Sequence, residues 1–197
     1  MTRSASLAES LRPAIKSERV LAAIAAVPRD PFVPGNARDR AYENVALPIG
    51  CGQTISQPVV VARMLELLEL QETDRVLDVG TGSGYHAALL AQLADQVWTI
   101  ERHAELGTEA ERALGGLGIR NVHFAIGDGA AGLPGDAPFD AINVAAATGA
   151  SVPEALLDQL AVGGRLVAPV GLEGQHLTLI RRTERGFEAT TLEPVRF

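Results

Sequence analysis

Hydrophobic positions follow two different spacings along the chain, and together they predict a series of helices and strands. Apolar residues over 4–26 recur at helical spacing, which predicts one N-terminal helix. From residue 59 onward, short apolar runs typical of buried strands alternate with helical patterns. The expected helices span 59–70, a segment around 87–91, 104–117 and 153–160. The expected strands span 76–79, 96–100, 122–126, 139–146 and 165–170, followed by a hairpin of 176–182 and 187–192.

This order of elements predicts an α/β fold. We expect a doubly wound, Rossmann-like, mostly parallel sheet with a C-terminal antiparallel hairpin and an extra N-terminal helix. A length of 197 residues fits one domain with a full-sized core. We therefore expect a single domain over 1–197, with an N-terminal helix and covering loop in 1–58 and the Rossmann-like core in 59–197. The long polar stretch 35–58 contains apolar and aromatic residues, which favours an ordered, functional loop.

Three glycines lie two residues apart after the apolar run that predicts the first core strand. Gly80, Gly82 and Gly84 would let the backbone turn sharply and let a ligand approach the next helix. A dinucleotide fingerprint reads G-x-G-x-x-G, whereas Tyr85 stands where its last glycine belongs, which disfavours a nicotinamide oxidoreductase. Asp78 just before the glycines suits a ligand with an ammonium group and no phosphate, such as S-adenosylmethionine. The alternative is a strand-turn-helix that binds no ligand.

Two further acids close predicted strands. Glu101 lies 21 positions after Gly80, where a carboxylate can accept both hydroxyls of a ribose; the alternative is a solvated acid in a charged turn. Asp128 lies between two glycines, where it could accept a hydrogen bond from an adenine amino group or simply form an Asp-Gly turn. Because ligands of such sheets bind at the carboxyl ends of the strands, the acids together predict one positively charged adenosyl ligand.

A second cluster of chemistry-bearing residues precedes the helix expected at 59–70. It reads Gly50-Cys51-Gly52-Gln53-Thr54-Ile55-Ser56-Gln57-Pro58. Thr54 or Ser56 could cap that helix; alternatively, the loop folds over the cofactor and places hydroxyl and N–H groups on an acceptor. A serine nucleophile is disfavoured because no G-x-S-x-G elbow is present. The four histidines lack the spacing of metal ligands, so we expect no metal.

Composition and charge narrow the class of protein further. A net charge of −7 with a single lysine disfavours nucleic-acid binding. No apolar run approaches the roughly 20 residues needed to cross a bilayer, and the N-terminus lacks the apolar centre of a signal peptide. The single Cys51 excludes an intramolecular disulfide. We therefore expect a cytoplasmic monomer that binds neither nucleic acid nor membrane.

Several segments of the chain resemble the protein-L-isoaspartate O-methyltransferase family. The glycine segment 80–85 is shared by many methyltransferases, whereas the block Gln53-Thr54-Ile55-Ser56 is specific to this family. The resemblance runs from about Val27 to the C-terminus and implies a class I methyltransferase fold. The matching segments are 32–34, 42–44, 47–58, 80–85, 100–102, 127–129, 137–142 and 153–160.

The resemblance also implies a reaction and a set of residues. It implies methyl transfer from S-adenosylmethionine to the α-carboxylate of isoaspartyl residues in damaged proteins and peptides, which initiates repair and leaves S-adenosylhomocysteine. Ser56 would be the active-site serine, and the substrate-binding residues would be Gln53, Thr54, Ile55 and Ser56. The implied cofactor-binding residues are Asp78, Gly80, Thr81, Gly82, Ser83, Gly84, Glu101, Arg102, Gly127, Asp128 and Gly129. Two alternatives stay open: a methyltransferase acting on another carboxylate, and a catalytically silent member that binds isoaspartyl peptides.

Three features depart from the family pattern. Ala145 stands where the family usually has threonine after its fourth strand. Cys51 and His86 stand where related bacterial sequences often have glutamine. Family members usually continue past the equivalent of 195–197 with a Val-Pro-Leu segment, which the sequence given does not contain. For this sequence we therefore expect weaker peptide binding and nearly normal cofactor binding.

Overall fold

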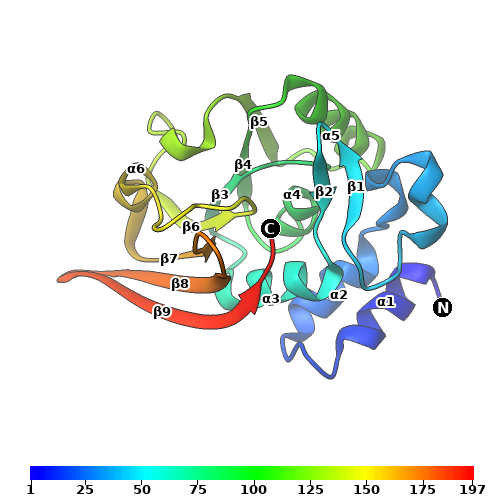
Figure 1. Cartoon of the computed structure of the whole chain (residues 1–197), viewed down its shortest axis with the longest axis horizontal. Coiled ribbons are helices and arrows are strands. Elements are labelled where there is room, and N and C mark those ends of the chain that lie inside the picture. Colours follow the sequence, from blue (N-terminus) through cyan, green and yellow to red (C-terminus); the bar gives the residue numbers. More distant parts are fainter.

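A seven-stranded sheet forms the centre of the computed structural model, which describes all residues from Met1 to Phe197 (Figure 1). The strands lie in the order β5-β4-β3-β6-β7-β8-β9, and the first five in this order are parallel to their neighbours. The last two add antiparallel at one edge. Their bounds are β3 (Arg75–Val79), β4 (Gln96–Glu101), β5 (Val122–Ile126), β6 (Phe139–Val144), β7 (Leu160–Val170), β8 (Gln175–Thr183) and β9 (Gly186–Val195). The predicted α/β fold class, with its parallel sheet and C-terminal hairpin, is confirmed.

Helices cover both faces of this sheet because neighbouring residues of a strand point to opposite sides. Val76 and Val167 belong to the larger core, whereas Leu77 and Leu166 belong to the smaller one. The larger core is built with residues of α3 (Pro58–Leu68), α4 (Tyr85–Leu90) and α5 (Ala104–Gly116), and the smaller core includes a residue of α6 (Glu154–Asp158). Both faces of the central strands β3 and β6 are therefore buried, which explains their continuous apolar runs, whereas the edge strand β5 has no buried residue.

The N-terminal helical pattern divides into two helices, so the single helix expected over 4–26 is wrong. Helix α1 (Arg3–Leu11) ends shortly before Pro13, which has no N–H to donate and whose ring clashes with the preceding turn. Helix α2 (Glu18–Ala26) begins after Ser17, whose side chain accepts a hydrogen bond from the N–H of Val20. The two helices pack against each other and join the larger core.

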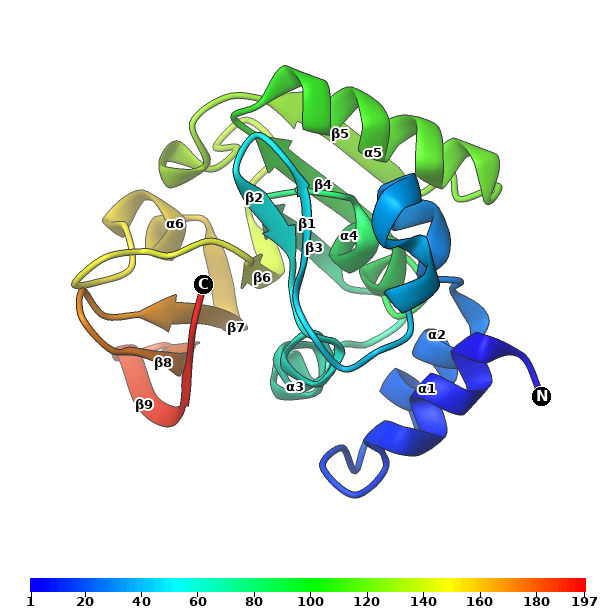
Figure 2. The same ribbon diagram turned by 45° about the vertical axis from the view of Figure 1, so that its right-hand side comes forward.

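The stretch 35–58 contains more regular structure than the sequence predicts. It includes the 3₁₀ helix η2 (Gly35–Arg40) and a hairpin of two short strands, β1 (Leu47–Gly50) and β2 (Gln53–Ile55). The turn between these strands has positive φ angles at Cys51 and Gly52, 50° and 69°. Figure 2 shows the hairpin in front of β3, β4 and α4. The expectation of an ordered segment is met, and the division of the chain at residue 58 stays a prediction.

Other elements differ from expectation mainly at their ends. Strand β7 begins at Leu160, ahead of the expected start at Arg165, because Leu160 already pairs with Phe139 of β6. Between Leu160 and Arg165 the pairing is irregular, and Gly163 has a positive φ of 84°. Helix α6 is correspondingly shorter than the helix expected over 153–160. None of the helices combines the length and the apolar character needed to cross a membrane.

Candidate active site

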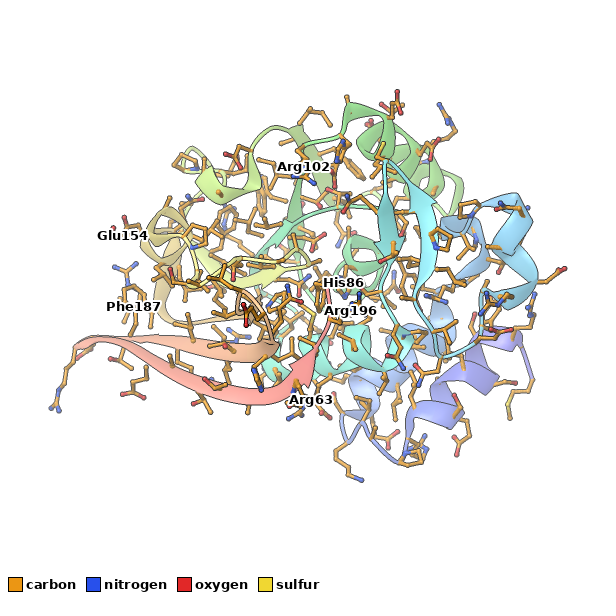
Figure 3. The ribbon with its side chains drawn as sticks, in the orientation of Figure 1. Arg63, His86, Arg102, Glu154, Phe187 and Arg196 are labelled. Carbon is orange, nitrogen blue, oxygen red and sulfur yellow. The ribbon has the colours of Figure 1, made fainter.

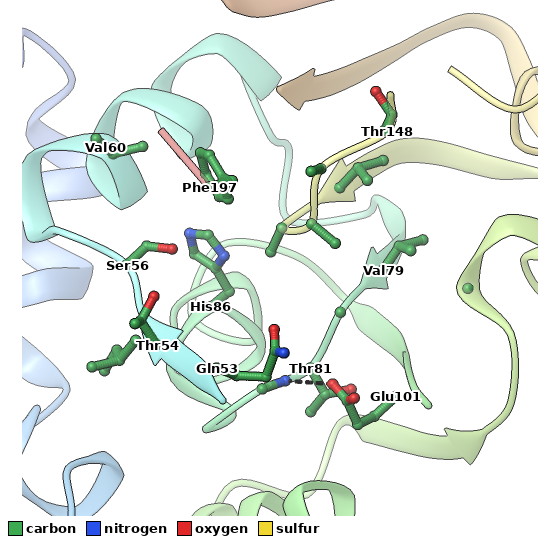
Figure 4. Close-up of a pocket in the computed structure, with 18 of the residues that line it drawn as sticks. Gln53, Thr54, Ser56, Val60, Val79, Thr81, His86, Glu101, Thr148 and Phe197 are labelled. Carbon is green, nitrogen blue, oxygen red and sulfur yellow. Dashed lines mark hydrogen bonds between the residues drawn. The ribbon is translucent and has the colours of Figure 1, made fainter. Parts of the chain in front are cut away.

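A pocket of about 1200 Å³ lies where several carboxyl ends of the parallel strands meet, beside the β1–β2 hairpin (Figure 4). Its walls come from separate parts of the chain, which are the hairpin with the start of α3, the turn after β3, the three segments after β4, β5 and β6, and the residues 194–197. Strands β4 and β6 flank β3 on opposite sides. The chain therefore builds the sheet outward from β3 in one direction and then in the other, which makes β3 the switch point of the sheet. Ligands of doubly wound sheets bind at such a point.

The glycine turn after β3 forms one wall of the pocket. Gly80 and Gly82 have φ angles of 91° and 52°, which residues with a Cβ adopt at a cost. A Cβ on Gly80 would lie 3.4 Å from the Cβ of Ala146 and would narrow the space at the wall. Thr81 and Ser83 also line the pocket. The turn therefore presents backbone to the cavity, as a ligand cradle requires.

Gly84 has a different reason to be glycine. It does not line the pocket, and its φ of 89° marks the start of α4. A Cβ there would lie 2.7 Å from Leu114 and 2.9 Å from Ala110, both on α5. Gly84 therefore allows α4 to pack closely on α5, and this geometry does not support the expected ligand contact.

Glu101 closes β4 and reaches back to the glycine turn. Its Oε2 accepts a hydrogen bond of 2.9 Å from the N–H of Gly82, drawn as a dashed line in Figure 4. Its Oε1 accepts one of 3.0 Å from the N–H of His103. Because an ionised carboxylate has about four acceptor positions, these two bonds orient Glu101 and leave lone pairs for a ligand. Glu101 lines the pocket although its side chain is largely buried.

The segment after β5 brings a second carboxylate to the pocket. Asp128 Oδ1 accepts a hydrogen bond of 3.0 Å from the N–H of Ala130 and caps the short helix η3 (Gly129–Ala131). Asp128 and Gly129 line the pocket, as does Arg102 after β4, whereas Gly127 does not. The turn role and the pocket position of Asp128 therefore coexist.

Asp78 is the main correction to the expected site. Its side chain is 0% exposed and does not line the pocket, so it offers no surface to an ammonium group. Instead, its oxygens accept hydrogen bonds from Thr99 Oγ1 at 2.9 Å and from Asn143 Nδ2 at 2.7 Å. Burial raises the pKa of Asp78 to about 7, against the effect of these bonds. Asp78 thus joins three neighbouring strands behind the pocket.

The predicted substrate-binding block faces the same cavity. Gln53, Thr54, Ile55 and Ser56 all line the pocket. The alternative role of Thr54 or Ser56 as a helix cap is not supported, because Gln57 is the N-cap of α3 and its side chain makes no capping bond. Asn44 supplies the missing acceptor, since its Oδ1 accepts a hydrogen bond of 3.0 Å from Val59. The Ser56 hydroxyl is therefore free of capping.

Arg29 holds this block in place, and the sequence contains no local signal for it. The guanidinium is fully buried and donates to the carbonyl oxygens of Ala41 and Ser56, the latter at 3.0 Å. Burial lowers the pKa of Arg29 to about 10, which still leaves it protonated at neutral pH. A buried cation bonded to carbonyl groups from several segments fixes the backbone at Ser56.

His86 and the last residues of the chain also line the pocket. His86 is 6% exposed, and its Nε2 has no hydrogen-bond partner. Burial lowers the pKa of His86 to about 4, so the ring is neutral at pH 7.

Arg196 and Phe197 follow β9 and also line the pocket. Figure 3 shows Arg196 near the middle of the view, whereas Phe187 lies out on the β8–β9 hairpin. The Phe197 N–H donates to Gln175 Oε1 at 2.7 Å.

Comparison with known proteins identifies the family. The sequence pattern of the protein-L-isoaspartate (D-aspartate) O-methyltransferase family matches residues 3–197. Protein-L-isoaspartate O-methyltransferases of Shewanella baltica and Shewanella loihica are 51% and 50% identical, over all of this chain and 93% of theirs. The chain belongs to the protein-L-isoaspartate O-methyltransferase family.

Solved structures agree with this membership. One protein-L-isoaspartate O-methyltransferase superposes with a TM-score of 0.91 at 29% identity over the whole chain, which spans 65% of that protein's length. A Plasmodium falciparum protein described as a putative member, crystallised with S-adenosylhomocysteine, has a TM-score of 0.86 at 26% identity, covering 100% of this chain and 97% of that one. The expected class I fold, methyltransferase activity and S-adenosylmethionine cofactor are confirmed by these family relationships.

The pocket residues fit S-adenosylmethionine. Backbone without Cβ atoms at Gly80 and Gly82 leaves room for close approach, and Glu101 and Asp128 offer carboxylate acceptors at the ends of neighbouring strands. No group of three or more His, Cys, Asp and Glu side chains is arranged to hold a metal ion. The expected absence of a metal stays a prediction.

Proposed function

We propose that this chain methylates the free α-carboxylate of isoaspartyl residues, with Ser56 orienting that carboxylate. The observation that carries the proposal is a single pocket shared by the Gln53-to-Ser56 block and the turn bounded by Gly80 and Glu101. One side of this pocket carries hydroxyl groups free of capping roles, and the other carries carboxylates and exposed backbone. Such a pocket can hold an acceptor and an adenosyl cofactor next to each other.

The reaction needs alignment more than activation. An α-carboxylate has an ordinary pKa of about 3.5 and is already ionised at pH 7, so the site needs no general base. When bound, S-adenosylmethionine supplies an electrophilic methyl group on a sulfonium. The Ser56 hydroxyl donates a hydrogen bond to one carboxylate oxygen. The other carboxylate oxygen is left free to face the methyl group. Such positioning can contribute several kcal/mol to lowering the barrier, out of roughly 7–11 for ideal alignment.

The remaining residues divide into those that contact the cofactor and those that support it. Glu101 would accept hydrogen bonds from the ribose hydroxyls, and Asp128 would accept one from the adenine amino group. The turn from Gly80 to Ser83 supplies backbone at the methionine end, and Arg102 and Gly129 contribute to the same wall. Asp78, Gly84 and Gly127 support this wall from behind. A cytoplasmic location and a monomeric state stay predictions from composition.

The substitution Ser56→Ala tests the assignment. We expect kcat/KM on an isoaspartyl peptide to fall about tenfold or more, since one hydrogen bond to a charged acceptor contributes about 1.5–3 kcal/mol. The melting temperature and the affinity for S-adenosylhomocysteine should stay within error, because Ser56 caps no helix. The measurement is radiolabelled methyl transfer to the isoaspartyl peptide and to its normal aspartyl twin.

The matched control is Ser10→Ala on the exposed side of α1, whose hydroxyl bonds only to Leu7 of the same helix. It should leave kcat/KM and the affinity for S-adenosylhomocysteine unchanged and should shift stability by no more than about 0.5 kcal/mol. Equal transfer to the aspartyl twin would contradict the acceptor. A folded Ser56→Ala protein with wild-type kcat/KM would remove Ser56 from the site.

A further inference from the structure

A line of hydrogen bonds runs behind the pocket and ends at His86. Thr99 and Asn143 are the register partners of Asp78 on the two strands that flank β3, so the three side chains lie in a row on one face of the sheet. Thr99 donates to Asp78 at 2.9 Å, and Asn143 donates to it at 2.7 Å. Asn143 Nδ2 also lies 3.4 Å from His86 Nδ1. The row therefore connects a buried carboxylate to a ring that lines the pocket.

The direction of the two bonds at Asn143 follows from its side-chain amide nitrogen, which can only donate. Asn143 Nδ2 carries two protons. One forms the hydrogen bond to Asp78, and the other is available for the contact with His86 Nδ1. The His86 Nδ1 must then accept and carries no proton. Because the ring is neutral, its single proton lies on Nε2. The row thus selects one tautomer and leaves an N–H donor at the pocket end of the ring.

This donor has no partner in the protein. His86 Nε2 is buried and makes no hydrogen bond, and a buried polar group without a partner costs free energy. The ring lines the pocket together with Ser56, and Figure 4 shows the Ser56 hydroxyl and the His86 ring turned towards the same part of it. Glu101 and Thr81 lie at the other end of this view. The donor therefore serves the end of the pocket away from Glu101.

We propose that His86 is a substrate-binding residue whose Nε2–H donates to a carboxylate oxygen of the isoaspartyl acceptor, next to the donor Ser56. This inference rests on the proposed function. Two neutral donors hold the acceptor in one orientation and do not cancel the negative charge that attacks the methyl group. S-adenosylmethionine also has a carboxylate, so the tests must separate the two possible sources.

Kinetics on two His86 variants give the first test. His86→Leu keeps an apolar side chain of similar reach without a donor, and His86→Gln keeps an N–H donor. We expect His86→Leu to raise the KM for the isoaspartyl peptide about tenfold or more, the effect of one lost hydrogen bond to a charged group. His86→Gln should recover most of this loss. The affinity for S-adenosylhomocysteine should change less than about twofold in both variants. Loss of a hydrogen bond from His86 to this molecule would instead lower its affinity about tenfold. His123→Leu on the exposed side of β5 is the control.

The outcomes separate cleanly. An inactive wild-type protein on isoaspartyl peptides would overturn the proposed function and this inference with it. An active wild type with an unchanged KM in a folded His86→Leu protein would overturn this inference alone. Weaker binding of S-adenosylhomocysteine with an unchanged peptide KM would assign the donor to the cofactor carboxylate instead and equally overturn it.

Nitrogen NMR of the imidazole rings tests the same inference without turnover. The His86 signals, identified by their loss in His86→Gln, should show an unprotonated Nδ1 and a protonated Nε2 at pH 7. Adding an isoaspartyl peptide to the protein saturated with S-adenosylhomocysteine should shift the Nε2–H signal, whereas adding S-adenosylhomocysteine alone should not. A proton found on Nδ1, or a shift caused by the cofactor product alone, would contradict the proposal.

Discussion

At the scale of single residues, burial sets the charge of His86, which lines the pocket, and of Asp78, which lies behind it. Burial disfavours the charged form of both groups, so it lowers the pKa of His86 to about 4 and raises that of Asp78 to about 7. Asn143 lies between them and donates to both. The shared neighbour links the ionisation of Asp78 to the orientation of the ring, although the two groups never touch.

The pKa of His86 predicts a loss of stability in mild acid. Between pH 6.5 and 4 the unfolded chain binds a proton at His86 that the folded chain excludes, so this contribution to stability falls as the pH falls. On going from pH 7 to 4.5, the wild type should lose about 2 kcal/mol more than His86→Gln. Urea unfolding at both pH values measures this difference. Equal losses in the two proteins would mean that folding leaves the pKa of His86 unchanged.

Asp78 acts in the opposite sense over a similar window. Its pKa is raised on folding, so its contribution is fully present below about pH 3.8 and is lost as the pH rises through about 7. Because Asp78 is present in both proteins, its effect cancels in the comparison of the wild type with His86→Gln, apart from any coupling through Asn143.

Glu101 carries the sharpest residue-level prediction for the cofactor. Glu101→Ala should weaken the binding of S-adenosylhomocysteine by about 1.5–3 kcal/mol, the range for hydrogen bonds to a charged group. It should also lower the melting temperature, since Gly82 and His103 lose their acceptor. Calorimetry on the folded variant measures the affinity. Glu109→Ala, on the exposed side of α5, is the control, and an unchanged affinity in Glu101→Ala would exclude Glu101 from the cofactor site.

At the scale of elements, the join between the glycine turn and α4 depends on close contact with α5. Gly84 has a positive φ, and a Cβ on this residue would lie 2.7 Å from Leu114. Both features act before any ligand is bound, so they concern stability more than chemistry. The hairpin β1–β2 is a second such element, because Arg29 and Asn44 hold the residues that follow it against the rest of the fold.

Gly84→Ala should therefore destabilise the protein by roughly 2 kcal/mol or more, since a left-handed backbone alone costs about 1–2 kcal/mol with a Cβ present. The control is Gly115→Ala within α5, where the nearest atom to the new Cβ is Arg120 Nη1 at 3.7 Å. That change should be neutral or stabilise by up to about 1 kcal/mol, because alanine favours helix. Chemical denaturation of both variants decides the matter, and equal stabilities would refute the packing role of Gly84.

At the scale of the whole molecule, the pocket joins distant parts of the chain. Residues of the β1–β2 hairpin, the sheet and 194–197 line the same cavity, and the C-terminus turns back towards the centre of the view in Figure 1. A ligand in this pocket would contact several segments that lie far apart in the sequence. Binding should therefore stabilise several elements together.

Hydrogen exchange should reveal this joint effect. At a concentration of S-adenosylhomocysteine of 100 times its Kd, global opening should become costlier by about 2.7 kcal/mol. Amides that exchange through local opening should slow most in 80–84 and in 101–103, with smaller protection in 53–57, and should change little in α1. Uniform slowing that includes the fraying ends of α1 would indicate only a global effect, with no preferential ordering of the pocket.

The sequence by itself determined the order of helices and strands, the glycine turn and the acids that end the strands. These features rest on local periodicity and turn chemistry, which a short window of residues contains. The Gln53-to-Ser56 block was likewise visible as a motif, and Glu101, Asp128 and Ser56 do line the pocket. Their roles in binding stay proposals, while the family they indicated is established.

Only the tertiary structure decided which groups the side chains of Asp78, Arg29 and His86 contact. Asp78 reads as a ligand-facing acid beside a glycine turn, but the register of β3 with β4 and β6 places Thr99 and Asn143 next to it. The partners of Arg29 and His86 lie up to 57 positions away. The side of a strand that is buried, and the polar groups that meet there, depend on pairing between distant segments, which local patterns do not specify.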